Sequence, residues 1–374
     1  MLWRARVIRS TQHMRDRFRL YGAALLAITV LIPGAMPRAE TQGSADLERR
    51  IAVFTRYLDP LRTQAAIPGL SAAVVSGGRV FWEAGFGYAD VERRIAAAPD
   101  TPYRIASLTK TFASTLLLRC VETGTLELDQ PIRTFGVTTP DASATVRHVL
   151  AMASDAPAGS AYRYDGDRYA TLTAVIDVCA RAPFRQALQA QILDRLAMTN
   201  SVPGQDLEAP PADVAALFDA ATLARYRSVI ARLAKPYATE DGHAVLADYP
   251  PRGISAAAGL ISTVRDLVRY DAAIDGNTLV RRESQTVAWT PFVLTSSQRS
   301  PYGLGWFSQS TTAGRAIWHY GLWPTFSSLI LKLPDRGVTL ILLANSDGLS
   351  ARFPLANGDV TVSPFARAFV AAVR

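Results

Sequence analysis

Lysine is nearly absent from this chain of 374 residues, which contains 37 arginines but only three lysines. Histidine and cysteine are also scarce, with four and two residues. The histidines are scattered, and neither a His-Glu-x-x-His sequence nor a paired-cysteine spacing occurs, so the sequence does not support a zinc site. It has no glycine-rich phosphate loop and, after residue 40, no arginine run with interleaved aromatic residues, so we do not expect nucleic-acid binding.

The basic residues are concentrated at the N-terminus. Residues 1–39 hold seven Arg and one Asp, whereas the rest of the chain has 33 basic and 31 acidic residues. Six of these arginines precede an apolar stretch from Leu20 to Met36, and the small residues Ala35 and Ala39 offer cleavage points. Positive charge before a short apolar segment is typical of an export signal. We therefore expect residues 1–39 to be a signal peptide or an uncleaved N-terminal anchor, with the remainder periplasmic, either free or anchored to the inner membrane.

The two cysteines, Cys120 and Cys179, are both surrounded by apolar residues at helical spacing. An exported protein can join two such residues in a disulfide. Free cysteine is nevertheless among the most often buried residue types, so we favour two small buried side chains and leave the bridge open.

One of the three lysines, Lys110, stands three residues after a serine in the sequence Ser107-Leu108-Thr109-Lys110. Residues 109–123 carry apolar side chains at helical spacing and end at Gly124, so we expect Ser107 in the first turn of a helix with Lys110 on the same face. Arginine keeps its proton, whereas a partly buried lysine can lose it and act as a base. The Ser107 amide near the helix start can also donate to an oxyanion. An isolated Ser-x-x-Lys is a weak signal, and the rest of the chain has to support it.

Strand patterns occur at the two ends of the chain, and mostly helical patterns lie between them. Residues 69–75 and 79–88 read as one hairpin, and residues 325–333 and 338–345 as another. Helical patterns include residues 171–181, 184–196, 263–274 and 363–373. We therefore predict a mixed α/β (α+β) fold. In it, an antiparallel sheet built from N- and C-terminal strands is flanked by helices, with an inserted, mostly helical subdomain.

Several short motifs follow one another in an order that resembles the serine β-lactamase and penicillin-binding-protein superfamily. The similar branch holds class C β-lactamases, D-alanyl-D-alanine carboxypeptidases and related esterases. The motifs are Ile67-Pro68-Gly69 and residues 85–90, 103–112, 259–263, 302–306 and 319–321. The resemblance covers residues 45–374 and implies a sheet part at about 45–100 and 300–374 and a helical part at about 101–299. It also implies a small-molecule or peptide substrate and no cofactor.

The resemblance assigns Tyr164 to the place of the tyrosine in a Tyr-x-Asn motif, which is thought to help move protons to and from the serine. We expect Lys110 nearby to favour the Tyr164 phenolate and lower its pKa. Tyr162 is close enough to shift this alignment. Gly166 stands where relatives have the asparagine, a departure from the pattern.

A second motif, His319-Tyr320-Gly321, stands where relatives have Lys-Thr-Gly or His-x-Gly on the strand beside the site. The resemblance implies that His319 faces the polar end of the substrate and that Gly321 lets the substrate approach the strand. The amide of Leu322 would then be the second oxyanion donor. His148, by contrast, is expected to be structural.

Other catalytic patterns are weaker. Residues 69–73 loosely resemble a nucleophile elbow around Ser71, but no helix follows the strand, so an α/β-hydrolase is not expected. Gly166 and the Ser154-Asp155 pair, where relatives usually have Ser-Gly, leave open a catalytically impaired penicillin-recognising or sensor protein. A β-lactamase or D-alanyl-D-alanine carboxypeptidase is a further alternative. Our interpretation is a serine hydrolase that forms an acyl-enzyme with a small ester or D-amino-acid amide and is weak on β-lactams.

Overall fold

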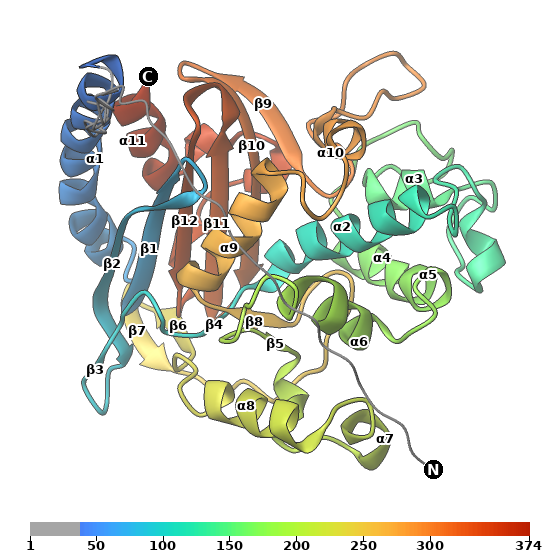
Figure 1. Cartoon of the computed structure of the whole chain (residues 1–374), viewed down its shortest axis with the longest axis horizontal. Helices are drawn as coiled ribbons and strands as arrows, with labels where there is room; N and C mark the ends of the chain where they lie inside the picture. Colours follow the sequence, from blue (N-terminus) through green and yellow to red (C-terminus); the bar gives the residue numbers. More distant parts are fainter. Residues whose placement is uncertain (1–37) are drawn as a thin grey trace, which may run out of the picture. The chain divides into compact units, whose positions relative to one another are not determined.

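An antiparallel sheet of seven strands forms the centre of the computed structural model, which describes residues 38–374 (Figure 1). The sheet belongs to a compact unit that spans Ala45–Arg374. Its strand order is β3-β2-β1-β12-β11-β10-β9. The strands are β1 (Gly69–Ser76), β2 (Arg79–Asp90), β3 (Ile95–Ala96), β9 (Phe307–Thr311), β10 (Gly314–Trp323), β11 (Phe326–Leu333) and β12 (Val338–Ala344).

The two ends of the chain meet in the middle of this sheet. Strand β1 pairs with β12, with Leu70 opposite Ala344, so the N-terminal hairpin extends the C-terminal strands. All residues of β11 and β12 are buried, which explains why these strands read as continuous apolar runs rather than as alternating ones. The predicted fold class is confirmed.

Helices cover both faces of the sheet. Helix α1 (Arg38–Gln64) and helix α11 (Pro364–Val373) lie side by side, with the rings of Phe54 and Phe369 5.3 Å apart (Figure 1). Helix α9 (Val264–Asp275) packs on the opposite face against β1, β2 and β12. A buried ion pair joins α9 to the sheet, because Lys332 on β11 donates to Asp271 at 2.5 Å.

The inserted part between the two halves of the sheet is mostly helical. Its helices are α2 (Thr109–Glu122), α3 (Val146–Leu150), α4 (Gly166–Ala170), α5 (Leu172–Cys179), α6 (Phe184–Leu188), α7 (Ala212–Ala215), α8 (Ala220–Ile230) and α10 (Arg282–Trp289). A small sheet of β4 (Tyr103–Arg104), β8 (Leu260–Ser262) and β5 (Val202–Pro203) lies at its base, beside a hairpin of β6 (Tyr237–Glu240) and β7 (His243–Leu246). Helix α2 is buried along most of its length, as its apolar spacing predicts.

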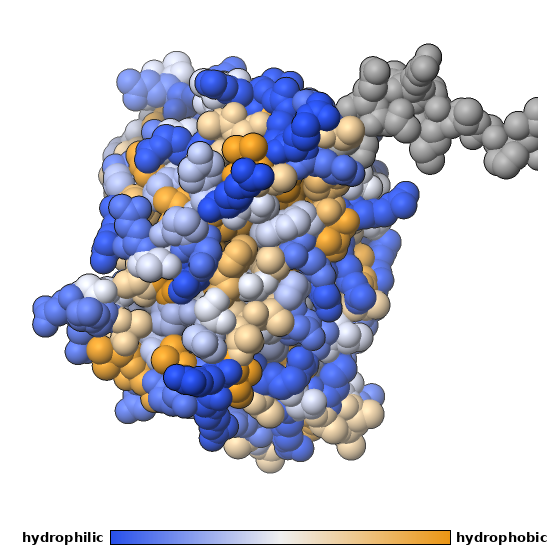
Figure 2. Space-filling view, turned by 90° about the vertical axis from the view of Figure 1, so that its left-hand side faces the viewer, coloured by the Kyte–Doolittle hydropathy of each residue, from blue (hydrophilic) through white to orange (hydrophobic). Residues whose placement is uncertain are grey.

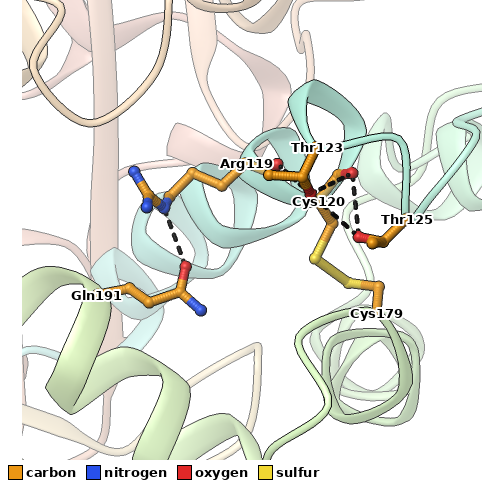
Figure 3. The surroundings of a disulfide bond; sticks show 6 residues. All are labelled: Arg119, Cys120, Thr123, Thr125, Cys179 and Gln191. Carbon is orange, nitrogen blue, oxygen red and sulfur yellow. Dashed lines mark hydrogen bonds between the residues drawn. A yellow bond between two sulfur atoms is a disulfide. The ribbon is translucent and has the colours of Figure 1, made fainter.

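A disulfide joins Cys120 on α2 to Cys179 on α5 (Figure 3). We favoured two unbonded side chains from the sequence. Both residues are indeed buried, but they are also bonded to each other. The bridge therefore fastens α2, the helix that follows the predicted nucleophile, to the neighbouring helix.

The side of the molecule where α1 and β2 lie is mainly hydrophilic, with small and separate hydrophobic patches (Figure 2). No helix among the described residues has the length and apolar character needed to cross a membrane. The predicted signal peptide or anchor, residues 1–39, lies almost wholly outside the described residues.

Candidate active site

Ser107 lies in a single turn of 3-10 helix, Ala106–Leu108, between β4 and α2. It therefore comes just before the α-helix rather than within its first turn. Ala106 has φ +47°, in the left-handed region that residues with a side chain rarely occupy. Such strain is maintained only where the surrounding structure imposes it, often at functional sites. The turn leaves the Ser107 side chain half-buried rather than enclosed.

Gly321 allows this turn to pack closely against the main sheet. A Cβ atom at Gly321 would overlap the Ile105 carbonyl oxygen and the Ser328 hydroxyl, and it would lie 3.1 Å from the Ala106 side chain. The Ser328 hydroxyl also donates to the Ile105 oxygen at 2.8 Å. We expected Gly321 to make room for substrate. It instead makes room for the protein's own turn, which lets β10 approach Ser107 closely.

Lys110 is the buried partner of Ser107. Its side chain is 1% exposed, and its Nζ lies 2.9 Å from Ser107 Oγ and 3.0 Å from the Ala257 carbonyl oxygen. Burial lowers the pKa of Lys110 to about 7, although Asp165 and Asp167 act in the opposite direction. Much of the lysine is therefore uncharged near neutral pH, which suits a general base.

Tyr164 stands beside this pair, with Lys110 Nζ 5.3 Å from the centre of its ring. Its hydroxyl is buried and makes no well-formed hydrogen bond with the described residues, although Ser107 is close enough to oppose part of the burial effect. Burial raises the pKa of Tyr164 well above 10, so the predicted phenolate was wrong and the residue is a neutral phenol. Tyr162 is engaged elsewhere, since its hydroxyl donates to the Ala356 carbonyl oxygen at 2.8 Å.

His319 is fully buried on β10 and is not among the residues that line the cavity beside Ser107. Its Nδ1 lies 2.7 Å from the Tyr320 carbonyl oxygen, which can only accept, so Nδ1 carries the proton and Nε2 accepts from the Tyr302 hydroxyl at 2.9 Å. Burial and the nearby Lys110 lower the pKa of His319 to about 3. Contrary to the prediction, the ring does not face the substrate side. It is a neutral ring that packs beside the Tyr164 ring, and the centres of the two rings lie 6.2 Å apart.

A cavity of about 480 Å³ opens at these residues. Of the predicted site residues, Ser107, Lys110, Tyr164, Gly166 and Leu322 line it, whereas His319 and Gly321 do not. Gly166 begins helix α4, and a Cβ atom added there would meet only the Lys110 amine, at 3.9 Å. The position is therefore open toward the cavity.

Leu322 lies where one edge of β10 is free. Strand β9 pairs with β10 only as far as Trp318, whereas β11 pairs with it through Trp323. Within residues 38–374, backbone groups of β10 beyond Trp318 therefore have no strand partner on the β9 side. The Leu322 amide belongs to this segment, and the residue lines the cavity together with Ser107.

Sequence comparison identifies the protein family of this chain. The profile of the Beta-lactamase family matches residues 54–360. The chain belongs to this family. A stretch of 103 residues is 32% identical to the mitochondrial serine beta-lactamase-like protein LACTB of Mus musculus, covering 28% of this chain and 19% of that protein. A stretch of 66 residues is 41% identical to protein flp of Staphylococcus aureus, covering 18% of this chain and 13% of that protein. The matches thus span less than a fifth of either relative.

A solved structure, that of the octameric penicillin-binding protein homologue from Pyrococcus abyssi, has the same fold. It aligns with a TM-score of 0.66 at 21% identity and covers 80% of this chain and 74% of that one. The Beta-lactamase family fold therefore extends over most of the chain, including the elements that carry Ser107, Lys110 and Tyr164.

Two further residues have structural roles in this member of the family. His148 Nδ1 accepts from the Thr145 amide at 3.1 Å and caps α3, as a structural role predicts. The Ser71 hydroxyl is buried and donates to the Ala98 carbonyl oxygen at 2.7 Å, so it is not a nucleophile. Among residues 38–374, no cluster of three His, Cys, Asp or Glu side chains could hold a metal ion.

Sequence reasoning missed the basic and aromatic end of the cavity. This end is lined by Arg104, Gln205, Tyr249, Arg252, Trp323 and Phe326. Arg104 stands only three residues before Ser107, and this spacing was the one available signal. The others come from distant segments, which only the folded chain brings together.

Proposed function

We propose that this chain is a serine hydrolase that works through an acyl-enzyme. The neutral Lys110 amine takes the proton of the Ser107 hydroxyl, and Ser107 Oγ bonds to the carbonyl carbon of an ester or amide. The bond to the leaving group then breaks, and the leaving oxygen or nitrogen takes up a proton from the site. A water molecule then gives up a proton to the site and bonds to the acyl carbon. The bond from that carbon to Ser107 Oγ breaks, and Ser107 Oγ recovers its proton. The observation that carries this proposal is the 2.9 Å contact between Ser107 Oγ and a lysine whose pKa is about 7.

Two other parts of the site support the same chemistry. Tyr164 is a neutral phenol beside Ser107, so it can donate a proton to a leaving group and recover one from Lys110. The amides of Ser107 and Leu322 are the proposed oxyanion donors, because both residues line the same cavity. No step in this sequence needs a cofactor.

The preferred substrate is a small ester or D-amino-acid derivative rather than a β-lactam. Gly166 has no side chain to hydrogen-bond an amide on the substrate, although the position is open toward the cavity. An ester without such an amide loses less from this absence. We therefore propose slow turnover of β-lactams and faster turnover of short esters.

A fluorophosphonate probe and a substrate panel test this proposal. The purified chain is labelled, then assayed with p-nitrophenyl butyrate, a D-alanyl-D-alanine dipeptide and nitrocefin, with Ser107→Ala as the matched control. We expect labelling and ester turnover that both disappear in Ser107→Ala while its circular dichroism spectrum is unchanged. Labelling at another residue, or equal turnover by Ser107→Ala, contradicts the mechanism. Acylation by penicillin without turnover of any substrate would support the penicillin-recognising sensor instead.

We also propose that the chain is exported. Its N-terminal charge pattern favours translocation, and the Cys120–Cys179 disulfide suits an oxidising compartment. Alkaline phosphatase fused after residue 60 should be active in cells. An inactive, cytoplasmic fusion would contradict export.

A further inference from the structure

The guanidinium group of Arg104 lies at the cavity wall and is only partly satisfied by the protein. Arg104 is 9% exposed, and its Nε donates to Gln205 Oε1 at 2.7 Å. Within residues 38–374, its two terminal nitrogens have no hydrogen bond and no carboxylate partner within ion-pair distance. These two nitrogens form one of the guanidinium edges that can bind two oxygens of one anion.

Two carboxylates of the described residues lie in this region, but neither forms an ion pair with Arg104. Asp206, next to the Gln205 that holds Arg104, is already bound to Arg185 by contacts of 2.9 and 3.3 Å. Glu208 does not lie within ion-pair distance of Arg104; Tyr249 and Glu208 both favour the charged form, but burial outweighs them. Burial lowers the pKa of Arg104 to about 10, so the side chain remains a cation at neutral pH. A buried cation without an anion is costly, and a ligand can supply the missing partner.

Arg252 brings a second cation to the same end of the cavity. Its side chain is exposed and has no ion pair with the described residues, and its guanidinium carbon lies 5.1 Å from the Trp323 ring and 5.8 Å from the Tyr249 ring. The guanidinium of Arg104 lies 4.5 Å from that same Tyr249 ring. Tyr249 therefore contacts both cations and holds them in the same part of the cavity.

The backbone of Arg252 connects the two arginines a second time. Its carbonyl oxygen accepts from the amides of Gln205 at 2.9 Å and Asp206 at 3.2 Å. Gln205, fixed in this way, orients Arg104 through its side chain. The arrangement is thus built from contacts among several segments rather than from two surface arginines that happen to be close.

We propose that Arg104 and Arg252 form a carboxylate-binding subsite, and that the preferred acyl donors carry a carboxylate on their acyl part. This inference rests on the proposed function for the identity of the ligand as an acyl donor. Arg104 and Ser107 are three residues apart, so their Cα atoms are separated by at most about 11 Å, and both line one cavity, in which an acyl group on Ser107 can extend toward Arg104. Phe326 and Trp323 provide apolar walls for the methylene groups between the ester and the acid.

The charges of the cavity also decide which part of the substrate carries the acid. Asp167 lines the cavity on the Tyr164 side and favours the charged form of Lys110, whereas the neighbouring Asp165 is already paired with Arg163 at 2.9 Å. A second negative charge would be repelled there. The leaving group therefore occupies the Tyr164 side, where the phenol can protonate it, and the anionic acyl part extends toward the arginines.

The kinetic test compares two esters that differ only in the end of the acyl chain. They are 4-nitrophenyl hydrogen glutarate, which ends in a carboxylate, and 4-nitrophenyl valerate, which ends in a methyl group. We expect the ratio of their kcat/KM values to favour the glutarate in the natural chain and to fall about 10- to 100-fold in Arg104→Gln and in Arg252→Gln. Arg79→Gln, an exposed arginine outside the cavity, is the control and should leave the ratio unchanged. A natural ratio that favours valerate, or one that neither variant changes, overturns the subsite.

A binding measurement separates this inference from the proposed function. Monomethyl glutarate and dimethyl glutarate are titrated calorimetrically into Ser107→Ala, alone and combined with Arg252→Gln, whose exposed position tolerates substitution. Arg252-dependent binding of the monoester alone supports the subsite even if Ser107 proves not to be the nucleophile. Equal binding of both esters refutes the subsite, whatever the outcome of the labelling experiment.

Discussion

Lys110 Nζ lies 2.9 Å from Ser107 Oγ and has no carboxylate within ion-pair distance among the described residues. Lys332, which is equally buried, shows the opposite arrangement, with Asp271 at 2.5 Å and Asp275 at 2.8 Å. Burial disfavours both charges, but the two carboxylates outweigh it and raise the pKa of Lys332, whereas the pKa of Lys110 falls to about 7. One buried lysine is therefore kept as a cation that joins α9 to the sheet, and the other can release its proton near neutral pH.

Replacing Lys110 by arginine should damage activity nearly as much as replacing it by alanine. Arginine keeps the charge but cannot act as a base, so we expect kcat/KM for p-nitrophenyl butyrate to fall about 100- to 10,000-fold in Lys110→Arg. Thermal melting checks that both variants fold. An active Lys110→Arg enzyme would show that Lys110 supplies only a positive field.

The activity should rise with pH through the pKa of Lys110. The neutral amine is the base, and its pKa is about 7, so kcat/KM falls about tenfold for each pH unit below that value and levels off above it. Because Asp167 favours the protonated lysine, Asp167→Asn should move the midpoint to lower pH. Asp213→Asn on α7 serves as the control. A midpoint that does not respond to Asp167→Asn would assign the titration to another group.

Local sequence patterns predicted those parts of the site whose geometry is local. Ser107 and Lys110 are one helical turn apart, and this spacing alone determines that they share a face. The hairpins at the two ends of the chain likewise follow from turn residues and apolar runs. Tyr164 required the family resemblance, because nothing near it in the sequence distinguishes it from Tyr162.

The remaining features depend on contacts between distant segments, which no local pattern encodes. His319 is buried because aromatic residues of other segments enclose it, and its lowered pKa follows from that burial. The role of Gly321 depends on how closely the turn at Ile105 approaches β10. The partners of Arg104 are more than 100 residues away along the chain.

The disulfide should contribute to stability rather than to catalysis. Cys120 and Cys179 are separated by 59 residues, and closing a loop of that size stabilises a fold by about 4 kcal/mol in the chain-entropy model. We expect the Cys120→Ala/Cys179→Ala double variant to lose roughly this free energy of unfolding by urea titration and to keep its ester turnover at low temperature. The natural chain with reductant added should match it. A loss below about 1 kcal/mol would mean that the bridge merely joins helices already fixed by packing.

Restoring an asparagine at position 166 should shift the substrate preference toward β-lactams. Gly166 is the first residue of α4 and does not have a positive φ, and an added Cβ atom would lie 3.9 Å from the Lys110 amine, so the substitution fits without strain. The new side chain would donate to and accept from an amide on the substrate, which is worth about 1 kcal/mol or a five- to tenfold effect. We therefore expect the ratio of kcat/KM for nitrocefin to that for p-nitrophenyl butyrate to rise in Gly166→Asn. Gly166→Ala, which adds a side chain without hydrogen-bonding groups, should leave that ratio near the natural value. If the natural chain already cleaves nitrocefin more efficiently than the ester, or if asparagine and alanine have the same effect, Gly166 does not set specificity and a β-lactamase is the better description.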